Sequence, residues 1–265
     1  FYVIKRPTKI NSREFLSIKK QNNFKNLKIK NYKVSSAKII SNIQNIKKKR
    51  AYLVEYFDGK NGADILLQGN KTEIIMLKEF FKNYFFLNFK NTTLSIRDLQ
   101  NFKEKISKIK NNKNFKLIRN SKEFLNYLNL LLKKKIYNLS NKRCHGDLTL
   151  SNMIINSKKK SIILIDFLSC YEENIIQDIA KIFQEFELHW TARNYSRADS
   201  LRSKIVYSAI INNNFWRGIN KNLIYTFKLE FLMVVLRIIP YIKKDDNITI
   251  NWIENSLYKI IKFKM

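Results

Sequence analysis

The chain has 265 residues, 45% hydrophobic and 13% aromatic, which is enough apolar material for one or two domains with buried cores and excludes a disordered or fibrous protein. Only five glycines and two prolines favour long regular elements. Two cysteines, Cys144 and Cys170, are too few for a disulfide-stapled secreted scaffold, so we expect a reducing, cytoplasmic location.

The formal net charge of +30 invites a nucleic-acid-binding interpretation, because lysines release counterions from phosphate backbones. The charge is uneven: residues 1–143 contain 34 basic and 9 acidic residues, whereas residues 144–265 contain 17 and 12. The chain is also rich in Lys, Asn and Ile together, as a bias towards AT-rich codons would produce. Nucleic-acid binding is therefore the less favoured role, and it depends on the basic half forming one coherent patch.

No apolar stretch is long enough to span a membrane. The most apolar run, residues 231–242, is interrupted by Arg237 and Pro240, so we expect it to form a buried helix. The first five residues lack the apolar core and cleavage site of a signal peptide, and no initiator methionine is present. We therefore expect the chain to begin inside a domain.

The first 62 residues are predicted to contain mostly strands. Residues 1–5 form a short strand, a helix with Ser12 as its cap follows, and two strands over 37–43 and 51–56 are joined by a basic turn. Residues 58–62, Asp-Gly-Lys-Asn-Gly, form the clearest breaker cluster. The predicted organisation is an N-terminal unit over 1–57, a hinge or linker over 58–62 and a second unit over 63–265.

Beyond residue 62 the pattern becomes helical. Apolar residues at helical spacing predict a helix from Glu73 to Phe85. A more polar helix is predicted over 96–109, and a capping box at Asn120 predicts another over 120–137. The remaining predicted elements are short strands at 143–145, 153–155 and 161–165 and mostly helices from Gln177 onward.

Three side chains with oxygen atoms, those of Asp147, Asn152 and Asp166, lie on loops next to short apolar strands, where a rigid scaffold exposes them to a ligand. Their oxygens suit Mg²⁺, which is a hard cation that keeps waters and substrate phosphates among its ligands. A carboxylate held off the metal can orient an attacking hydroxyl and accept its proton. Phosphoryl transfer needs this division of roles, because its catalysis is mostly positioning and charge neutralisation.

His145-Gly-Asp147 with Asn152, followed by Ile165-Asp166-Phe167, resembles the signature of the aminoglycoside phosphotransferase and choline kinase group, small-molecule kinases with a protein-kinase-like fold. The resemblance implies an α+β, two-lobed fold with a truncated small β-rich N-lobe and a mainly α-helical C-lobe. It implies that Asp147 is the catalytic base, that Asn152 and Asp166 hold Mg²⁺, and that His145 is a scaffold residue of the catalytic loop. Asp178 matches the residue that braces this loop through its backbone.

The upstream half extends the resemblance. Lys5 matches the lysine that reaches the α and β phosphates of ATP, and Glu14 matches its ion-pair partner. Glu55 and Phe57 lie where the hinge would bind adenine. The last third of the chain contains no matching motif. The sequence departs from the protein-kinase pattern in two ways. Asp166 is followed by Phe-Leu rather than Phe-Gly, and no glycine that could form a phosphate loop occurs before Gly59.

The resemblance implies ATP- and Mg²⁺-dependent phosphorylation of a hydroxyl on a small molecule, such as a sugar, an amino sugar or an amino alcohol. Acidic residues in the second half would suit a cationic acceptor, although a solvated helix face is the simpler interpretation; they are Glu172, Glu173, Glu185 and Glu187. The alternatives are a catalytically silent kinase-like binding module and a basic nucleic-acid-binding protein. The acceptor's identity and the oligomeric state are not indicated by the sequence.

Overall fold

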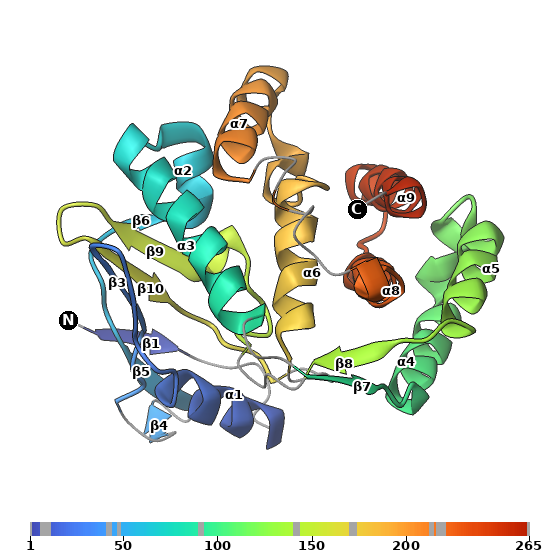
Figure 1. Ribbon diagram of the computed structural model, residues 1–265, viewed down its shortest axis with the longest axis horizontal. Helices are drawn as coiled ribbons and strands as arrows, with labels where there is room; N and C mark the ends of the chain where they lie inside the picture. Colours follow the sequence, from blue (N-terminus) through green and yellow to red (C-terminus); the bar gives the residue numbers. More distant parts are fainter. Residues whose placement is uncertain are drawn as a thin grey trace.

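The structure is a computed structural model, and it describes residues 2–5, 12–40, 44–46, 49–89, 93–139, 144–169, 174–211, 215 and 221–263. Most of the strands gather at one end of the molecule, and most of the helices form the remainder (Figure 1). The chain is therefore a mixed α+β protein with a small sheet region and a larger helical part, which confirms the coarse class predicted from the sequence.

A three-stranded sheet in the order β1-β5-β4 opens the chain; its strands are β1 (Tyr2–Lys5), β4 (Gln44–Ile46) and β5 (Lys49–Glu55). β1 runs antiparallel to β5, so Lys5 lies opposite Tyr52. The helix α1 (Ser12–Asn22) lies beside this sheet (Figure 1). The strands predicted over 1–5 and 51–56 are thus confirmed. The strand predicted over 37–43 is reduced to one isolated bridge at Ile39, and its last three residues lie outside the described residues.

A five-stranded sheet in the order β2-β3-β10-β9-β6 supports the predicted catalytic segment; its strands are β2 (Leu27–Ile29), β3 (Tyr32–Ser36), β6 (Lys60–Asn61), β9 (Met153–Asn156) and β10 (Ser161–Leu164). The parallel pairing of β3 with β10 places Val34 opposite Ile162. The β2–β3 hairpin was not predicted. It places residues 27–36 of the predicted N-terminal unit in one sheet with strands of the second unit.

The segment predicted as a hinge or linker, residues 58–62, contains β6 and packs tightly against the segment around β9. A Cβ atom at Gly59 would lie 2.7 Å from the backbone oxygen of Ile155, and one at Gly62 would lie 2.5 Å from that of Leu150. The two glycines therefore allow a close approach of backbones, which larger residues would prevent.

The described helical part surrounds a central helix, α6, all of whose residues are buried (Figure 1). The α-helices after β6 are α2 (Gly62–Gln68), α3 (Lys71–Phe89), α4 (Gln100–Lys110), α5 (Ser121–Leu132), α6 (Ile175–Phe186), α7 (Arg197–Ile210), α8 (Ile224–Leu236) and α9 (Asn247–Lys262). Short 3-10 helices span Lys113–Leu117, Leu150–Asn152, Thr191–Asn194, Lys221–Leu223 and Ile239–Tyr241. A two-stranded sheet joins β7 (Leu94–Ile96) to β8 (Tyr137–Leu139).

Several predicted elements have different bounds. The helix predicted over 96–109 begins only at Gln100, because the residues before it pair as β7 with β8. The helix predicted over 120–137 ends at Leu132 for the same reason, and the side chain of Asn120 makes no capping hydrogen bond. Residues 144–145 form no strand. The helices predicted from Glu73 and in the last third of the chain are confirmed.

The apolar run over 231–242 forms the second half of α8 and a 3-10 turn that contains Pro240. Residues 226–227 and 229–236 of α8 are buried, as expected from their composition. Over the described ranges, the structure has no helix with the length and hydrophobicity that crossing a membrane requires.

A buried ion pair between Arg97 and Glu230 joins the segment between β7 and α4 to α8. Nη1 of Arg97 donates to Oε1 of Glu230 at 2.7 Å, and the side chains are 1% and 0% exposed. The guanidinium also lies 4.3 Å from the ring centroid of Phe102. Two charges removed from water in this way stabilise the fold only while both are present.

Replacing Glu230 by Gln is expected to lower the free energy of unfolding by about 3 kcal/mol, because Arg97 would keep a buried charge without a counterion. Urea unfolding measures this loss. The matched control Glu123→Gln, on the exposed first turn of α5, should change stability by less than about 0.5 kcal/mol. Equal losses in the two variants would contradict a structural role for the pair.

Candidate active site

A cleft of about 280 Å³ brings together most of the predicted site residues. It is lined by residues of β1, α1 and β5 and by the loops that precede β9 and follow β10. The predicted site residues that line it are Lys5, Glu14, Asp147, Asn152 and Asp166. The ammonium of Lys5 contacts the carboxylate of Asp166 across 161 positions of the chain. Distant segments of the sequence therefore meet at one cleft.

His145 holds the segment predicted to be catalytic in shape from inside the core. Its side chain is fully buried, Nδ1 accepts the N–H of Asp147 at 3.2 Å, and Nε2 donates to the carbonyl oxygen of Ile165 at 2.8 Å. Burial lowers the pKa of His145 to about 4, so the ring is neutral at physiological pH. Because both ring nitrogens have backbone partners, His145 can position the loop but has no atom left for a ligand.

Asp178 on α6 braces the same loop through its backbone. Its Oδ2 accepts the N–H of His145 at 2.6 Å, and its Oδ1 accepts the N–H of Gly146 at 2.7 Å. The hydroxyl of Tyr84 on α3 donates to Oδ2 at 2.7 Å. Burial raises the pKa of Asp178 to about 6, although these three hydrogen bonds favour the carboxylate. The geometry is the one that the resemblance implied for this residue.

Asp147 presents its carboxylate at the cleft and has partners on both oxygens. The amide nitrogen of Asn152 donates to Oδ2 at 3.1 Å and to the carbonyl oxygen of Asp147 at 2.8 Å. Nζ of Lys181 lies 2.8 Å from Oδ1, and Nη2 of Arg237 lies 3.3 Å from the same atom. Asp147 and Asn152 thus form one hydrogen-bonded unit, with two cations on its other side.

The two cations decide the charge state of Asp147. Burial alone disfavours the ionised carboxylate, but the charges of Lys181 and Arg237 outweigh burial and hold the pKa of Asp147 below its usual value. Burial disfavours the charged form of Lys181 at this position and lowers its own pKa. Asp147 is therefore an ionised carboxylate at neutral pH, able to accept a hydrogen bond from a hydroxyl.

Neither cation was predicted from the sequence. Lys181 follows Asp178 by three residues on α6, so helical spacing places both on one face, and this signal could have found it. Arg237 follows the end of α8. The one feature of the sequence that marked it was its charge, which interrupts an otherwise apolar run. Its proximity to Asp147 depends on the packing of α8, which no local pattern encodes.

Asp166 and Phe167 connect the cleft to α1. Asp166 is 46% exposed and has a φ of 58°, in the left-handed region that Asp and Asn tolerate better than most residues. The ring of Phe167 packs against His145, with 4.2 Å between ring centroids, and its N–H donates to Oε1 of Gln21 at 3.3 Å. Lys20 donates to the carbonyl oxygen of Leu168 at 2.8 Å. α1 therefore fixes the loop that carries Asp166.

Glu14 lies in the cleft and accepts a hydrogen bond from the hydroxyl of Tyr52 at 2.9 Å. Burial, followed by the proximity of Glu14, raises the pKa of that hydroxyl well above its usual value. The predicted ion pair between Lys5 and Glu14 stays a prediction. What the structure shows is that both side chains line one cleft, with Lys5 directed to Asp166.

The two predicted hinge residues do not line the cleft. Glu55 is the last residue of β5. Its N–H donates to the carbonyl oxygen of Lys38 at 2.9 Å, and its Oε2 accepts the N–H of Lys38 at 3.4 Å. Phe57 follows β5 and is partly exposed. The N–H of Glu55 is thus already engaged, and a role for these residues in binding adenine stays a prediction.

The oxygen donors of the cleft fit a cation that needs few protein ligands. Over the described residues, no group of three or more His, Cys, Asp or Glu side chains is arranged to hold a metal. The cleft instead offers the carboxylate of Asp166 and the amide oxygen of Asn152, because Asn152 uses its nitrogen for both contacts with Asp147. Such a sparse set of hard oxygens suits Mg²⁺, which completes its shell with waters and phosphates.

Of the acidic residues considered as a site for a cationic acceptor, the structure describes Glu185 and Glu187. Glu185 is buried in α6, and the hydroxyl of Thr191 donates to its Oε2 at 2.7 Å. Burial raises the pKa of Glu185 to about 7. Glu187 follows the end of α6, and Glu172 and Glu173 lie outside the described residues. The interpretation of Glu185 as an exposed acidic residue was therefore wrong.

Comparisons with known proteins add no further support to the site. No protein-family model, no curated protein and no solved structure matches this chain. The assignment of roles to the residues of the cleft therefore depends on their own geometry and on the resemblance of the short motifs. Neither the kinase-like fold nor the activity is established by a relative.

The raised pKa of Asp178 predicts a signed pH dependence. Because the pKa is about 6 in the folded protein and 3.8 in its ordinary state, the folded protein binds this proton more tightly. The stabilisation from the bound proton is therefore fully present below pH ~4 and is lost as the pH rises through ~6. Relative to Asp178→Asn, wild type should gain about 2 kcal/mol of unfolding free energy from pH 7 to pH 4.5.

Urea unfolding of both proteins at the two pH values measures this difference, in which the titration of other groups cancels. The control Asp64→Asn changes an exposed carboxylate on the first turn of α2, and its stability difference from wild type should stay nearly constant. A gain for wild type on raising the pH, in place of lowering it, would show that the folded protein stabilises the ionised form of Asp178.

Proposed function

We propose that the protein is an ATP- and Mg²⁺-dependent phosphotransferase that acts on a hydroxyl group of a small molecule. The observation that carries the proposal is the convergence of Lys5, Asp147, Asn152 and Asp166 on one cleft, although Lys5 is far from the others in sequence. The presence of these motif residues in one sequence does not require them to lie close together in the folded protein. Here they meet: the carboxylate of Asp147 lies beside the amide of Asn152, and Lys5 contacts Asp166.

Each residue has a distinct role in the proposed site. Bound Mg²⁺ supplies neutralisation of the triphosphate charge, and Asp166 and the amide oxygen of Asn152 are the residues that would hold it. Lys5 contributes a positive charge on the same side of the cleft as Asp166. Its ammonium, which contacts Asp166 in the structure, would turn from that carboxylate to phosphate oxygens and bind them as a point charge.

Asp147 acts on the acceptor. Its ionised carboxylate accepts a hydrogen bond from the attacking hydroxyl and holds the hydroxyl oxygen in line with the phosphoryl group. As the bond between that oxygen and phosphorus forms and the bond from phosphorus to the ADP oxygen breaks, the hydroxyl proton passes to Asp147. Lys181 and Arg237 keep the carboxylate ionised beforehand.

The loop that carries Asp147 needs rigidity, because a small displacement of the acceptor oxygen costs much of the rate. Asp178 and His145 supply it through hydrogen bonds to consecutive backbone N–H groups and to the end of β10. These two residues are positioning residues, since neither lines the cleft.

A catalytically silent kinase-like binding module is the second candidate. It would apply if the protein lacks a phosphate loop, since no glycine precedes Gly59 in the sequence. The two candidates share nucleotide binding in the cleft and differ in turnover. Phosphate transfer from Mg-ATP to a hydroxyl acceptor therefore separates them.

Replacing Asp147 by Asn should lower kcat by about 10²–10⁴-fold, because the amide cannot accept the proton. The affinity for Mg-ATP should stay within about threefold of wild type, since the carboxylate acts chiefly in the transition state. A coupled assay for ADP gives kcat, and calorimetric titration gives the affinity and shows that the variant is folded. A kcat equal to that of wild type would refute the role of Asp147.

Replacing Asp166 by Asn should weaken the binding of Mg-ATP by at least about tenfold, because one anionic ligand of the cation is lost. Asn tolerates the positive φ at this position, so the backbone should be preserved. The matched control is Asp245→Asn, another exposed Asp with a positive φ of 66°, which precedes α9. Unchanged Mg-ATP affinity in Asp166→Asn would count against the ligand role.

A further inference from the structure

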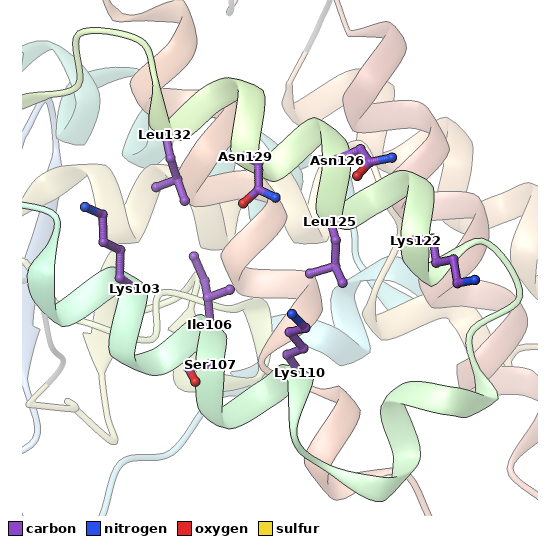
Figure 2. A pocket seen from close by; sticks show the side chains of 9 residues that line it. All are labelled: Lys103, Ile106, Ser107, Lys110, Lys122, Leu125, Asn126, Asn129 and Leu132. Atoms are coloured by element: carbon purple, nitrogen blue, oxygen red, sulfur yellow. The ribbon is translucent and has the colours of Figure 1, made fainter.

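A groove of about 480 Å³ lies between α4 and α5. Figure 2 shows the two helices side by side and running in opposite directions, with residues of both around the groove. Within the described ranges, no residue that lines the cleft around Asp147 also lines this groove. A ligand of the groove would therefore be distinct from the nucleotide and the acceptor of the proposed reaction.

The floor of the groove is apolar. It consists of Ile106 of α4 and of Leu125 and Leu132 of α5, which are half-buried and pack against the hydrophobic core. In Figure 2 the side chain of Ile106 is directed towards α5, and those of the two leucines are directed towards α4. Leu125 and Leu132 are separated by about two turns of α5, so they lie on one face of that helix. The floor therefore offers apolar contacts over about two helical turns.

The rims of the groove are polar and carry only positive charge. On α4, the exposed Lys103 and Lys110 are separated by about two turns and are directed into the groove (Figure 2). On α5, the rim consists of the exposed Lys122, Asn126 and Asn129. Among the residues that the structure describes, no acidic side chain lines the groove, and its three lysines take part in no ion pair or side-chain hydrogen bond. The lysines therefore lack counterions within this part of the chain.

An apolar floor between basic rims is complementary to an acidic amphipathic helix. The positive charges of the rims attract carboxylates. An apolar floor two turns long matches the i, i+3 or i+4, and i+7 side chains by which a helix lies in a groove. No aromatic side chain of the described residues lines the groove, so it offers no platform on which the bases of a nucleic acid could stack. A second copy of this chain is disfavoured as the occupant, because its net charge is +30.

We propose that the groove between α4 and α5 is a docking surface for an acidic amphipathic helix of a partner protein. The apolar face of that helix contacts Ile106, Leu125 and Leu132, and its carboxylates pair with Lys103 and Lys110. Exposed ion pairs contribute little each, so the apolar contacts supply most of the affinity and the lysines select the sign of the partner's charge. The inference does not depend on the proposed phosphotransferase function.

The first experiment compares three fluorescein-labelled helical peptides on the wild-type chain by fluorescence anisotropy, at about 0.15 M salt to screen the general attraction of a basic protein. The acidic peptide has leucines every three or four residues and glutamates on both sides of them. The second peptide has lysines in place of the glutamates, and the third has alanines in place of the leucines. We expect the acidic peptide to bind at least about tenfold more tightly than either of the others. Equal affinity for any other peptide of the three, or no saturable binding of the acidic peptide, would overturn the proposal.

The second experiment locates the binding site by reversing charge at exposed positions. Lys103→Glu/Lys110→Glu should weaken the binding of the acidic peptide at least about tenfold and strengthen that of the lysine peptide by a similar factor. The control Lys158→Glu/Lys159→Glu makes the same change of charge in the turn between β9 and β10, and it should shift both affinities less than about twofold. Equal effects of the two double variants would show attraction to the net charge of the protein and overturn the assignment of the groove.

A labelled oligouridine of about 20 nucleotides tests the competing occupant, a single-stranded nucleic acid. We expect its affinity for Lys103→Glu/Lys110→Glu to stay within about twofold of its affinity for the control variant, because the two variants have the same net charge. A loss of RNA binding of about tenfold or more in Lys103→Glu/Lys110→Glu alone would assign the groove to nucleic acid and overturn the proposal.

Discussion

The candidate site depends on one interaction: the buried carboxylate of Asp178 accepts hydrogen bonds from the consecutive N–H groups of His145 and Gly146. Those N–H groups would otherwise be buried without partners, which costs more than a hydrogen bond returns. Because the bonds come from α6, the orientation of the loop follows the central helix of the core. Asp147 is therefore placed by the packing of the whole helical part, and not by the loop's own preferences.

The same helix sets the charge of the site. One turn beyond Asp178, Lys181 reaches Asp147, and Arg237 arrives at the same oxygen from α8. Burial would favour a protonated Asp147, and the two cations reverse that tendency. In the proposed function, the position of the acceptor hydroxyl would thus follow from the packing of α6 and α8 against the loop of Asp147.

Local patterns predicted much of this arrangement. The spacing of Asp147, Asn152 and Asp166 around two short apolar strands indicated a candidate site, and the three residues line one cleft, because loops at strand ends are encoded by neighbouring residues. What the sequence could not indicate depends on contacts between distant segments. β7 and β8 interrupt the predicted helices only because they pair with each other, and β3 joins β10 across more than a hundred residues. Arg237 belongs to this second class, since its role appears only when α8 packs beside the loop.

The central claim is that the first cleft is a nucleotide site whose reactive end is at Asp147. The measurement that tests it most directly is a crystal structure of the protein with Mg²⁺ and a non-hydrolysable ATP analogue. The account predicts that the phosphates lie between Lys5 and Asp166, with the terminal phosphate directed towards Asp147. A nucleotide bound elsewhere, or one whose terminal phosphate points away from Asp147, would contradict it.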